Sequence, residues 1–365
     1  MNTYRIILWG AGNTAREALK FVSKSVKILG FFDNDPKITE FEGLHALDKE
    51  NIEQYEYDYI VICSVYYKEI YKQLISLTVD ESKILINPVS KAQSYQIYKA
   101  DFFVNKWRKL LKRKKPEIFI SGISYHNDGI QEQVFSECLG KEAFNFANRG
   151  QDIFYDFKIA ELLNKNGFLD HATHYIIGLC YYSFEYDMSK SVNGWEIIRY
   201  YPLIKEQHNF AVEIPFKDIV NSAKSYLEKN EIYHILFNKE CKHVVNDEEG
   251  RKTARADFNK NYPVTVWENK LLLKKFLSLL KEKHIKPIIV VMPAVRGYVK
   301  EVPLEFKERF YDALSDCIND VEEIQVLDYF GRYYGDISDY YHVSHLNTEG
   351  AKKFTRKLVE DISNA

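Results

Sequence analysis

The segment that decides the fold, residues 117–124, reads Glu-Ile-Phe-Ile-Ser-Gly-Ile-Ser. Its apolar run predicts a short buried strand, Glu117–Ile120. Gly122 allows a tight turn directly after this strand, and Ser124 follows the turn. Such a turn presents a hydroxyl at the end of a strand, which makes Ser124 a candidate nucleophile. Ser121 would still lie within the strand or at its end, and it is the weaker candidate.

A histidine near the end of the chain is a candidate general base for this serine. His345 begins the stretch His-Leu-Asn-Thr-Glu-Gly-Ala, and a helical pattern runs on from Asn347 to Ile362. Asn347 is a suitable cap for that helix, so His345 would lie just ahead of the first helical turn. Ser124 and His345 therefore form a candidate nucleophile–base pair, about 220 residues apart along the chain.

Composition describes a folded protein that is long enough for two domains. The 365 residues are 46% hydrophobic, which allows a sizeable core, and the net charge of −2 gives no reason to expect nucleic acid as a partner. The five cysteines are scattered, which is typical of reduced thiols rather than of a disulfide or zinc framework. We find no signal-peptide pattern and no apolar run of the ~20 residues that span a bilayer. We therefore expect a soluble, cytoplasmic protein.

Short apolar runs alternate with helical stretches, and this pattern predicts an α/β fold in two domains. Residues 1–90 are expected to form a Rossmann-like parallel sheet, and residues 116–365 a second α/β domain. More than 100 residues separate two expected strands of the second domain, which predicts a large insertion at about 180–265. Residues 91–115 are expected to be a basic helical linker. Its segment Lys106–Lys115 is either a peripheral contact to an anionic membrane surface or a solvated helix face.

A glycine-rich turn in the first domain indicates a nucleotide-type ligand. Gly10 and Gly12 follow the expected first strand and open a helix at Asn13, where the backbone can approach a phosphate group closely. Asp33 ends the second strand about 20 residues further on, where a carboxylate can accept a hydrogen bond from a ribose hydroxyl. The ligand is a nucleotide, a nucleotide sugar or NAD(P); the alternative is a domain that keeps the fold and binds nothing.

Two resemblances follow from these motifs. The Gly-x-Gly turn and the element Gly30–Asp33 resemble the Rossmann-like domain of sugar-modifying acyltransferases in bacterial surface-glycan pathways. Residues 116–365 resemble the SGNH (GDSL-type) hydrolases, in particular the branch that acts on bacterial cell-surface polymers. Gly122-Ile123-Ser124 matches the family's nucleophile block, Asn145–Gly150 its second block, and His345 its last block. The resemblance implies a flavodoxin-like three-layer α/β/α sandwich.

The resemblance also implies roles for single residues. Ser124 would be the nucleophile, His345 the base, and the N–H group of Gly150 an oxyanion donor. Cys180 stands where the family has an asparagine that completes the oxyanion hole. His342 stands where the family has the aspartate that orients the imidazole. Asp339 is a substitute for that carboxylate, as is Asp336; without either, the site would be a Ser–His dyad.

These observations predict a serine esterase or O-acyltransferase. Its substrate would be an acyl ester of a bacterial surface glycan or of its nucleotide-linked precursor, and the acyl chemistry needs no cofactor. No metal site is expected, because the pairs His171/His174 and His342/His345 lack further ligands at suitable spacing. The alternatives are a non-catalytic nucleotide-sugar-binding protein with a degenerate hydrolase domain, and an NAD(P)-dependent oxidoreductase. The acyl group, the acceptor and the oligomeric state are left open.

Overall fold

The structure is a computed structural model of the chain, and it divides into two compact units. The first unit comprises Met1–Asp101 and Pro215–His243, and the second comprises Phe102–Ile214 and Val244–Ala365. The structure describes residues 4–19, 22–23, 25–64, 66–87, 103–113, 115–191, 194–209, 236, 245–258, 265–319, 321, 323–332 and 335–364. No helix in these ranges is long and apolar enough to cross a membrane.

The first unit contains a four-stranded parallel sheet in the order β2-β1-β5-β6. Its two faces are covered by separate apolar clusters, so successive residues of each strand are buried on opposite sides. Ile6 and Leu8 face one cluster, and Ile7 and Trp9 the other. The elements are β1 (Tyr4–Trp9), α1 (Asn13–Leu19), β2 (Val26–Phe32), β3 (Glu40–Phe41), β4 (Leu44–His45), η1 (Lys49–Gln54), β5 (Tyr59–Ile62), α2 (Tyr67–Ser76), η2 (Glu81–Lys83) and β6 (Ile84–Ile86).

The second unit is built on a five-stranded parallel sheet in the order β11-β10-β9-β7-β8. Its strands are β7 (Ile118–Ser121), β8 (Ala143–Asn145), β9 (His174–Leu179), β10 (Lys286–Val291) and β11 (Gln325–Asp328). In this unit the first strand along the chain has the second and third as its neighbours, which is the doubly wound order. The predicted α/β class with parallel sheets is confirmed.

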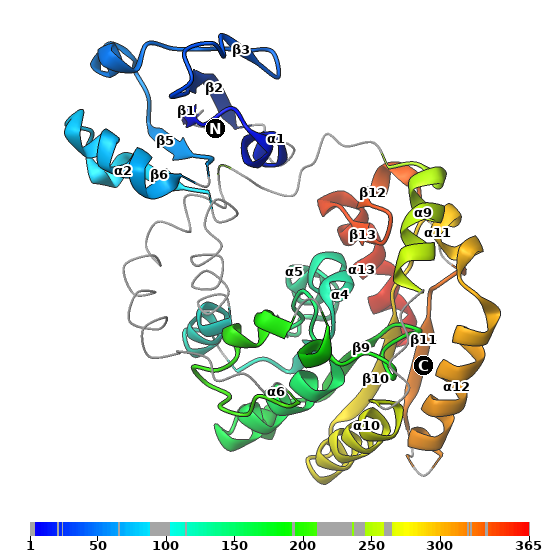
Figure 1. The fold of residues 1–365 in the computed structure, drawn as a ribbon. Helices are drawn as coiled ribbons and strands as arrows, with labels where there is room; N and C mark the ends of the chain where they lie inside the picture. Colours follow the sequence, from blue (N-terminus) through cyan, green and yellow to red (C-terminus); the bar gives the residue numbers. More distant parts are fainter. Residues whose placement is uncertain are drawn as a thin grey trace. The chain divides into compact units, whose positions relative to one another are not determined.

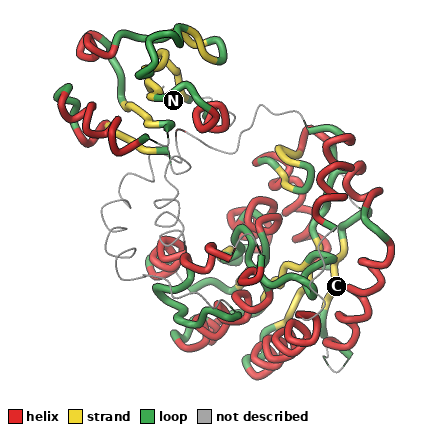
Figure 2. The backbone as a smooth tube through the Cα atoms, in the orientation of Figure 1, coloured by secondary structure: helices red, strands yellow, loops and turns green. Residues whose placement is uncertain are grey.

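Helices lie on both sides of this sheet (Figures 1 and 2). One group packs together as α6, α10 and α12, and the other as α4, α5 and α13. The elements are α4 (Ser124–Gly129), α5 (Glu132–Leu139), α6 (Ile153–Lys165), η4 (Leu169–His171), η5 (Met188–Lys190), η6 (Gly194–Arg199), α9 (Asp247–Asp257), α10 (Thr265–Glu282), α11 (Arg296–Glu301), α12 (Leu304–Ile318), η7 (Ile337–Asp339), β12 (Tyr340–His342), β13 (His345–Leu346) and α13 (Thr348–Ser363).

Two segments differ from the expected domain layout. Residues 103–111 form a helix that packs into the core of the second unit through Phe103, Trp107 and Leu110, so this part of the expected linker belongs to that unit. The expected insertion is divided between the units. Leu236 is fully buried in the first unit's core, where its carbonyl accepts the N–H of Ser23, whereas α9 belongs to the second unit.

Strand order places the candidate nucleophile at a site that ligands commonly use. In doubly wound sheets a crevice opens at the carboxyl ends of the strands where the winding direction reverses. In the second unit this point lies between β7 and β9. Ser124 follows the end of β7, and Cys180 follows the end of β9.

Candidate active site

Close packing beneath the serine turn requires glycine at two positions. Gly122 has φ 139°, and a Cβ on it would lie 2.8 Å from the Gly178 Cα of β9. A Cβ on Gly178 would lie 2.4 Å from the ring of His126. That ring is fully buried and fills the space that the two glycines leave open. Its Nε2 lies 3.0 Å from the Val290 carbonyl, and burial lowers the pKa of His126 to about 4, so the imidazole is neutral.

The structure brings Ser124 and His345 together. Nε2 of His345 lies 2.8 Å from Oγ of Ser124, within hydrogen-bonding distance. Ser121, by contrast, is fully buried at the end of β7. The Tyr125 ring packs edge-on against His345, with 4.8 Å between the ring centroids. A serine hydroxyl in this position can give its proton to the imidazole as it attacks a carbonyl carbon.

The other ring nitrogen of His345 faces a second histidine. β12 and β13 form a short antiparallel hairpin in which His342 and His345 are directly paired. Their Nδ1 atoms lie 3.2 Å apart, and Ser344 Oγ lies 3.2 Å from Nδ1 of His345. A neutral imidazole has one donor and one acceptor nitrogen. If Nδ1 of His345 donates to His342, its Nε2 is the acceptor that Ser124 requires.

Asp339, predicted as the orienting carboxylate, does not contact His345. Its carboxylate accepts the backbone N–H of Asp336 at 3.1 Å and the ammonium group of Lys353 at 2.5 Å. Asp336 in turn caps η7, so the two acids form a capping box. Both are satisfied by backbone donors and a lysine, which leaves the position beside Nδ1 of His345 to His342 and the Ser344 hydroxyl.

The Asn145–Gly150 segment lies beside the serine turn. The N–H of Asn148 donates to the Gly122 carbonyl at 2.9 Å, and Gly150 lies two residues further on with φ 66°. The Asn145 side chain donates to the His126 and Ile130 carbonyls, at 3.0 and 3.1 Å, so it holds the segment against α4. Sequence matching finds this segment but does not reveal that Asn145 is structural.

Asn148 is a candidate site residue that the sequence analysis did not single out. Its side chain is fully buried, and among the described residues neither its Nδ2 nor its Oδ1 has a hydrogen-bond partner. Buried amides are nearly always paired, so an unpaired one calls for a ligand or a functional explanation. Its place in Asn-Arg-Gly, two residues before Gly150, is the only signal that the sequence offers.

Side chains of residues that follow β9 donate hydrogen bonds to the predicted oxyanion segment and to the residue after it. They reach three consecutive residues, Arg149, Gly150 and Gln151. The pairs are Arg149 O with Arg199 Nη1 at 2.8 Å, Gly150 O with the Tyr186 hydroxyl at 3.0 Å, and Gln151 Oε1 with the Tyr200 hydroxyl at 2.7 Å. Two of these acceptors are backbone carbonyls and the third is a side-chain amide. The beginning of the expected insertion thus supports the site.

Lys106, expected in a basic linker, points inward instead. Its ammonium group donates to the side chain of Asn127 at 2.8 Å and to the carbonyls of Asn145 and Ala147 at 3.0 and 2.6 Å. It therefore ties α4 to the Asn145–Gly150 segment. A lysine in a run of basic residues carries no sequence signal for this role.

A small cavity is lined by Tyr125, which packs against His345, although neither Ser124 nor His345 lines the cavity itself. Its lining includes Tyr125 and Ser344, which adjoin Ser124 and His345 in sequence, together with Cys180. Its volume is about 20 Å³. The thiol of Cys180 lies 3.2 Å from Ser183 Oγ, and burial raises the pKa of that thiol to about 11, so it stays protonated. The thiol is a poor oxyanion donor.

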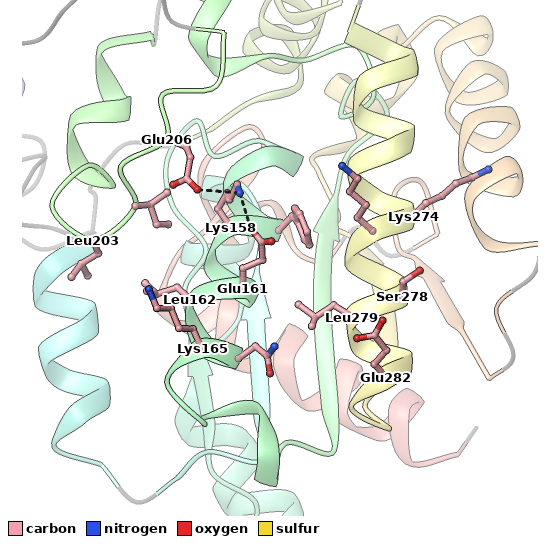
Figure 3. Close-up of a pocket in the computed structure, with 14 residues that line it drawn as sticks. Lys158, Glu161, Leu162, Lys165, Leu203, Glu206, Lys274, Ser278, Leu279 and Glu282 are labelled. Carbon is pink, nitrogen blue, oxygen red and sulfur yellow. Dashed lines mark hydrogen bonds and ion pairs between the residues drawn. The ribbon is translucent and has the colours of Figure 1, made fainter.

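A larger hollow of about 730 Å³ lies elsewhere on the second unit. It is lined by residues of α6 and α10 and by residues 203–206, and it contains neither Ser124 nor His345 (Figure 3). Lys158 lies in it, paired with Glu161 at 2.8 Å and Glu206 at 3.2 Å. The hollow shares no lining residue with the small cavity, so it is separate from the candidate active site.

In the first unit the predicted nucleotide-binding residues gather at the ends of β1 and β2. Gly10 has φ 110°, and a Cβ on it would lie 2.7 Å from the Cys63 carbonyl, so glycine is required there. Asp33 accepts the N–H of Ala11 at 2.8 Å, which ties its carboxylate to the glycine turn. The Asn13 side chain accepts a hydrogen bond from Arg16 at 2.8 Å. Binding of a nucleotide, nucleotide sugar or NAD(P) here stays a prediction.

Comparisons with known proteins give distant similarities. A family model described as C2185-like, N-terminal, matches residues 2–85. A solved structure from Streptococcus pneumonia, provisionally described as a platelet activating factor, aligns with 9% identity over 74% of this chain and 95% of that one, with a TM-score of 0.36. The lipase Lip_vut3 from goat rumen metagenome aligns with 13% identity over 66% of this chain and 94% of that one, with a TM-score of 0.32. No curated protein matches the sequence. Similarities this distant carry no functional argument.

Proposed function

We propose that the second unit is a serine esterase or O-acyltransferase. The observation that carries the proposal is the 2.8 Å contact between Oγ of Ser124 and Nε2 of His345, beside a small cavity at the switch point of a doubly wound sheet. A serine alone is a weak nucleophile at neutral pH, and a positioned imidazole that removes its proton is the usual means of activating it.

The proposed reaction has two halves. Ser124 Oγ attacks the carbonyl carbon of an ester while His345 takes its proton, and the oxyanion that forms needs preorganised donors. We assign this role to the N–H of Gly150 and propose the Asn148 amide as a second donor in place of Cys180. His345 then protonates the departing alcohol. Water or a sugar hydroxyl attacks the acyl-enzyme, with His345 again acting as base, so the acceptor decides between hydrolysis and transfer.

His342 would orient the base in this mechanism. As a hydrogen-bond acceptor it fixes the tautomer of His345, but as a neutral ring it stabilises the transient imidazolium less than a carboxylate does. In a serine protease, the carboxylate-to-amide change beside the base lowers the rate by ~10⁴. We therefore expect slow turnover together with a reactive serine.

The substrate class is the least constrained part of the proposal. We propose an acyl ester of a bacterial surface glycan or of its nucleotide-linked precursor, handled in the cytoplasm. We also propose that the first unit binds a nucleotide or nucleotide sugar. Support comes from the sequence resemblance and from the grouping of Gly10, Gly12, Asn13 and Asp33 at the strand ends. Titration with nucleotide sugars, monitored by thermal unfolding, tests this ligand. Tight NADH binding with carbonyl turnover would instead favour the oxidoreductase alternative.

Labelling with a fluorophosphonate probe and hydrolysis of p-nitrophenyl acetate test the catalytic assignment. We expect the wild-type protein to be labelled once and to hydrolyse the ester. Ser124→Ala should abolish both, whereas Ser278→Ala, at an exposed serine on α10, should change neither. Absence of labelling in the folded wild type across the pH range would instead favour the non-catalytic binding protein.

A further inference from the structure

Three side chains that the esterase mechanism does not use converge in the second unit. Asp152, Asp187 and His208 each place one ligand atom within 4.8 Å of the others. Asp152 precedes α6, Asp187 precedes η5, and His208 lies beyond η6. The two carboxylates are almost completely buried, and the imidazole side chain is 4% exposed. Sequence spacing does not reveal the cluster, because its members lie tens of residues apart.

The imidazole points an unsatisfied nitrogen at both acids. Nδ1 of His208 lies 3.4 Å from Asp187 Oδ1 and 3.9 Å from Asp152 Oδ2. Among the described residues neither contact has hydrogen-bond geometry, and each is an ion pair only if the ring is protonated. A buried nitrogen without a partner is rare and calls for a ligand. The ring itself is held in place, because it stacks on Phe154 with 4.2 Å between the ring centroids.

The spacing of these atoms suits a metal ion. Zn²⁺ binds imidazole nitrogen and carboxylate oxygen at ~2.0–2.2 Å, so neighbouring ligand atoms of a tetrahedral site lie ~3.3–3.5 Å apart. The 3.4 Å separation of Nδ1 and Asp187 Oδ1 matches this edge, and the 3.9 Å separation from Asp152 needs a shift of about 0.5 Å. A fourth position would be left for water.

The surroundings of the cluster also resemble a ligand shell. Nε2 of His208 lies 3.2 Å from Glu268 Oε1, and a metal-binding histidine usually directs its second nitrogen at a carboxylate. Asp152 accepts the N–H groups of Tyr155 and Met188, at 3.1 and 2.9 Å. Ligating carboxylates are commonly fixed by such hydrogen bonds.

Charge supports a cation at this place. Three carboxylates, Asp152, Asp187 and Glu268, surround the imidazole. In the part of the chain that the structure describes, the one lysine paired with them is Lys190, which lies 3.4 Å from Asp187 and is 41% exposed. Buried carboxylates are costly unless they are paired with positive charge. The missing charge is supplied either by a metal ion or by a proton on His208.

We propose that Asp152, Asp187 and Nδ1 of His208 bind one divalent transition-metal ion, of which Zn²⁺ is the best match. A nitrogen ligand disfavours Mg²⁺ and Ca²⁺, which take oxygen ligands. The ion would link separate segments of the second unit. It would join the residues around His208 to Asp152, which lies two residues after the predicted oxyanion donor Gly150. The proposal does not depend on esterase activity.

Calorimetric titration of the chelator-treated, untagged full chain with Zn²⁺, and in parallel with Mn²⁺, tests the proposal. We expect one tight Zn²⁺ site per chain and a higher thermal midpoint for the loaded protein. His208→Gln should abolish the tight site, and Glu268→Gln should weaken it ~10- to 100-fold, as loss of an orienting partner does. Asp170→Asn, at an acid outside the cluster, should leave binding unchanged.

The pair His342/His345 is the alternative zinc site in this unit, and His342→Gln provides the matched histidine control. Binding that His342→Gln removes and His208→Gln does not would overturn the assignment. So would the absence of tight binding by the folded wild type, which would mean that a proton on His208 balances the acids. If His208→Gln fails to fold, Co²⁺ replaces the variant test. A four-coordinate absorption spectrum with one nitrogen ligand supports the site, and an octahedral spectrum overturns it.

Discussion

Replacing His342 by aspartate is expected to raise the rate of ester hydrolysis. In the structure, Nδ1 of His342 lies 3.2 Å from Nδ1 of His345. Oδ1 of an aspartate is as many bonds from Cα as Nδ1 of a histidine, so the carboxylate oxygen can take the same position without a change in the backbone. The contact then changes from one between two rings to a hydrogen bond between the base and a carboxylate.

The size of the effect follows from the charge that forms on His345. A neutral hydrogen bond contributes about 1 kcal/mol, and one to a charged group about 1.5–3 kcal/mol. The imidazolium in the transition state would gain the difference, about 0.5–2 kcal/mol, which corresponds to a ~2- to 30-fold increase in kcat/KM. Coulomb's law at 4 Å and an effective dielectric constant of 20 gives about 4 kcal/mol as an upper limit.

Steady-state hydrolysis of p-nitrophenyl acetate, with active sites counted by fluorophosphonate titration, measures this change. His342→Asn is the matched control, because it places a neutral oxygen at the same position. We expect it to stay within ~3-fold of the wild type, since an acceptor for Nδ1–H is retained. If both variants fold and are labelled, but His342→Asp is no faster than His342→Asn, charge beside the base does not limit the reaction.

Three further outcomes are expected. Burial lowers the pKa of His126 from 6.5 to about 4, so its contribution to stability is complete above pH 6.5 and is lost as the pH falls towards 4. In urea titrations at several pH values, His126→Gln should remove on the order of 3 kcal/mol of this pH dependence of the unfolding free energy. Curves that do not change would contradict the burial argument. If the acyl group binds in the small cavity, acetyl esters should be cleaved ~5- to 150-fold faster than butyryl esters, because placing the two extra methylenes in this space costs about 1–3 kcal/mol. Equal rates would show that the acyl group binds elsewhere. Lys106→Met should lower the free energy of unfolding by about 1–3 kcal/mol, measured from the urea midpoint, because it leaves the Ala147 carbonyl without this donor. It should also lower kcat. A loss of stability with unchanged kcat would show that Lys106 has only a structural role.

The parts of the structure that could be predicted are those with local signals. A strand, a glycine and a serine identify the turn at Ser124, and an asparagine cap identifies the helix after His345. Ser124 lies directly after a strand and His345 directly before a helix, so the sequence predicts at which edge of the sheet each residue lies. Their convergence then follows from the parallel topology, in which the carboxyl ends of the strands meet at one edge.

The parts that could not be predicted depend on partners that are distant in sequence. Asp339 lies three residues before His342, and spacing alone makes it a reasonable orienting acid. One of its partners, the N–H of Asp336, is local, but the other, the side chain of Lys353, becomes available only when η7 and α13 are packed together. The inward direction of Lys106 and the division of the expected insertion between two units likewise depend on tertiary contacts.

The local geometry also explains how the Ser124–His345 pair forms with a histidine, His342, beside the base. The directly paired positions of the β12–β13 hairpin fix the separation of His342 and His345, whatever side chain stands at the first position. An acid three residues further back is removed from this pairing by the capping box. The backbone therefore supplies the orientation that a carboxylate otherwise supplies, whereas the charge stabilisation is missing. We therefore expect Ser124 to react readily with an activated phosphonate and to turn over esters slowly. The ratio of the two rates measures how far orientation of the base by the hairpin, without a neighbouring carboxylate, supports the reaction.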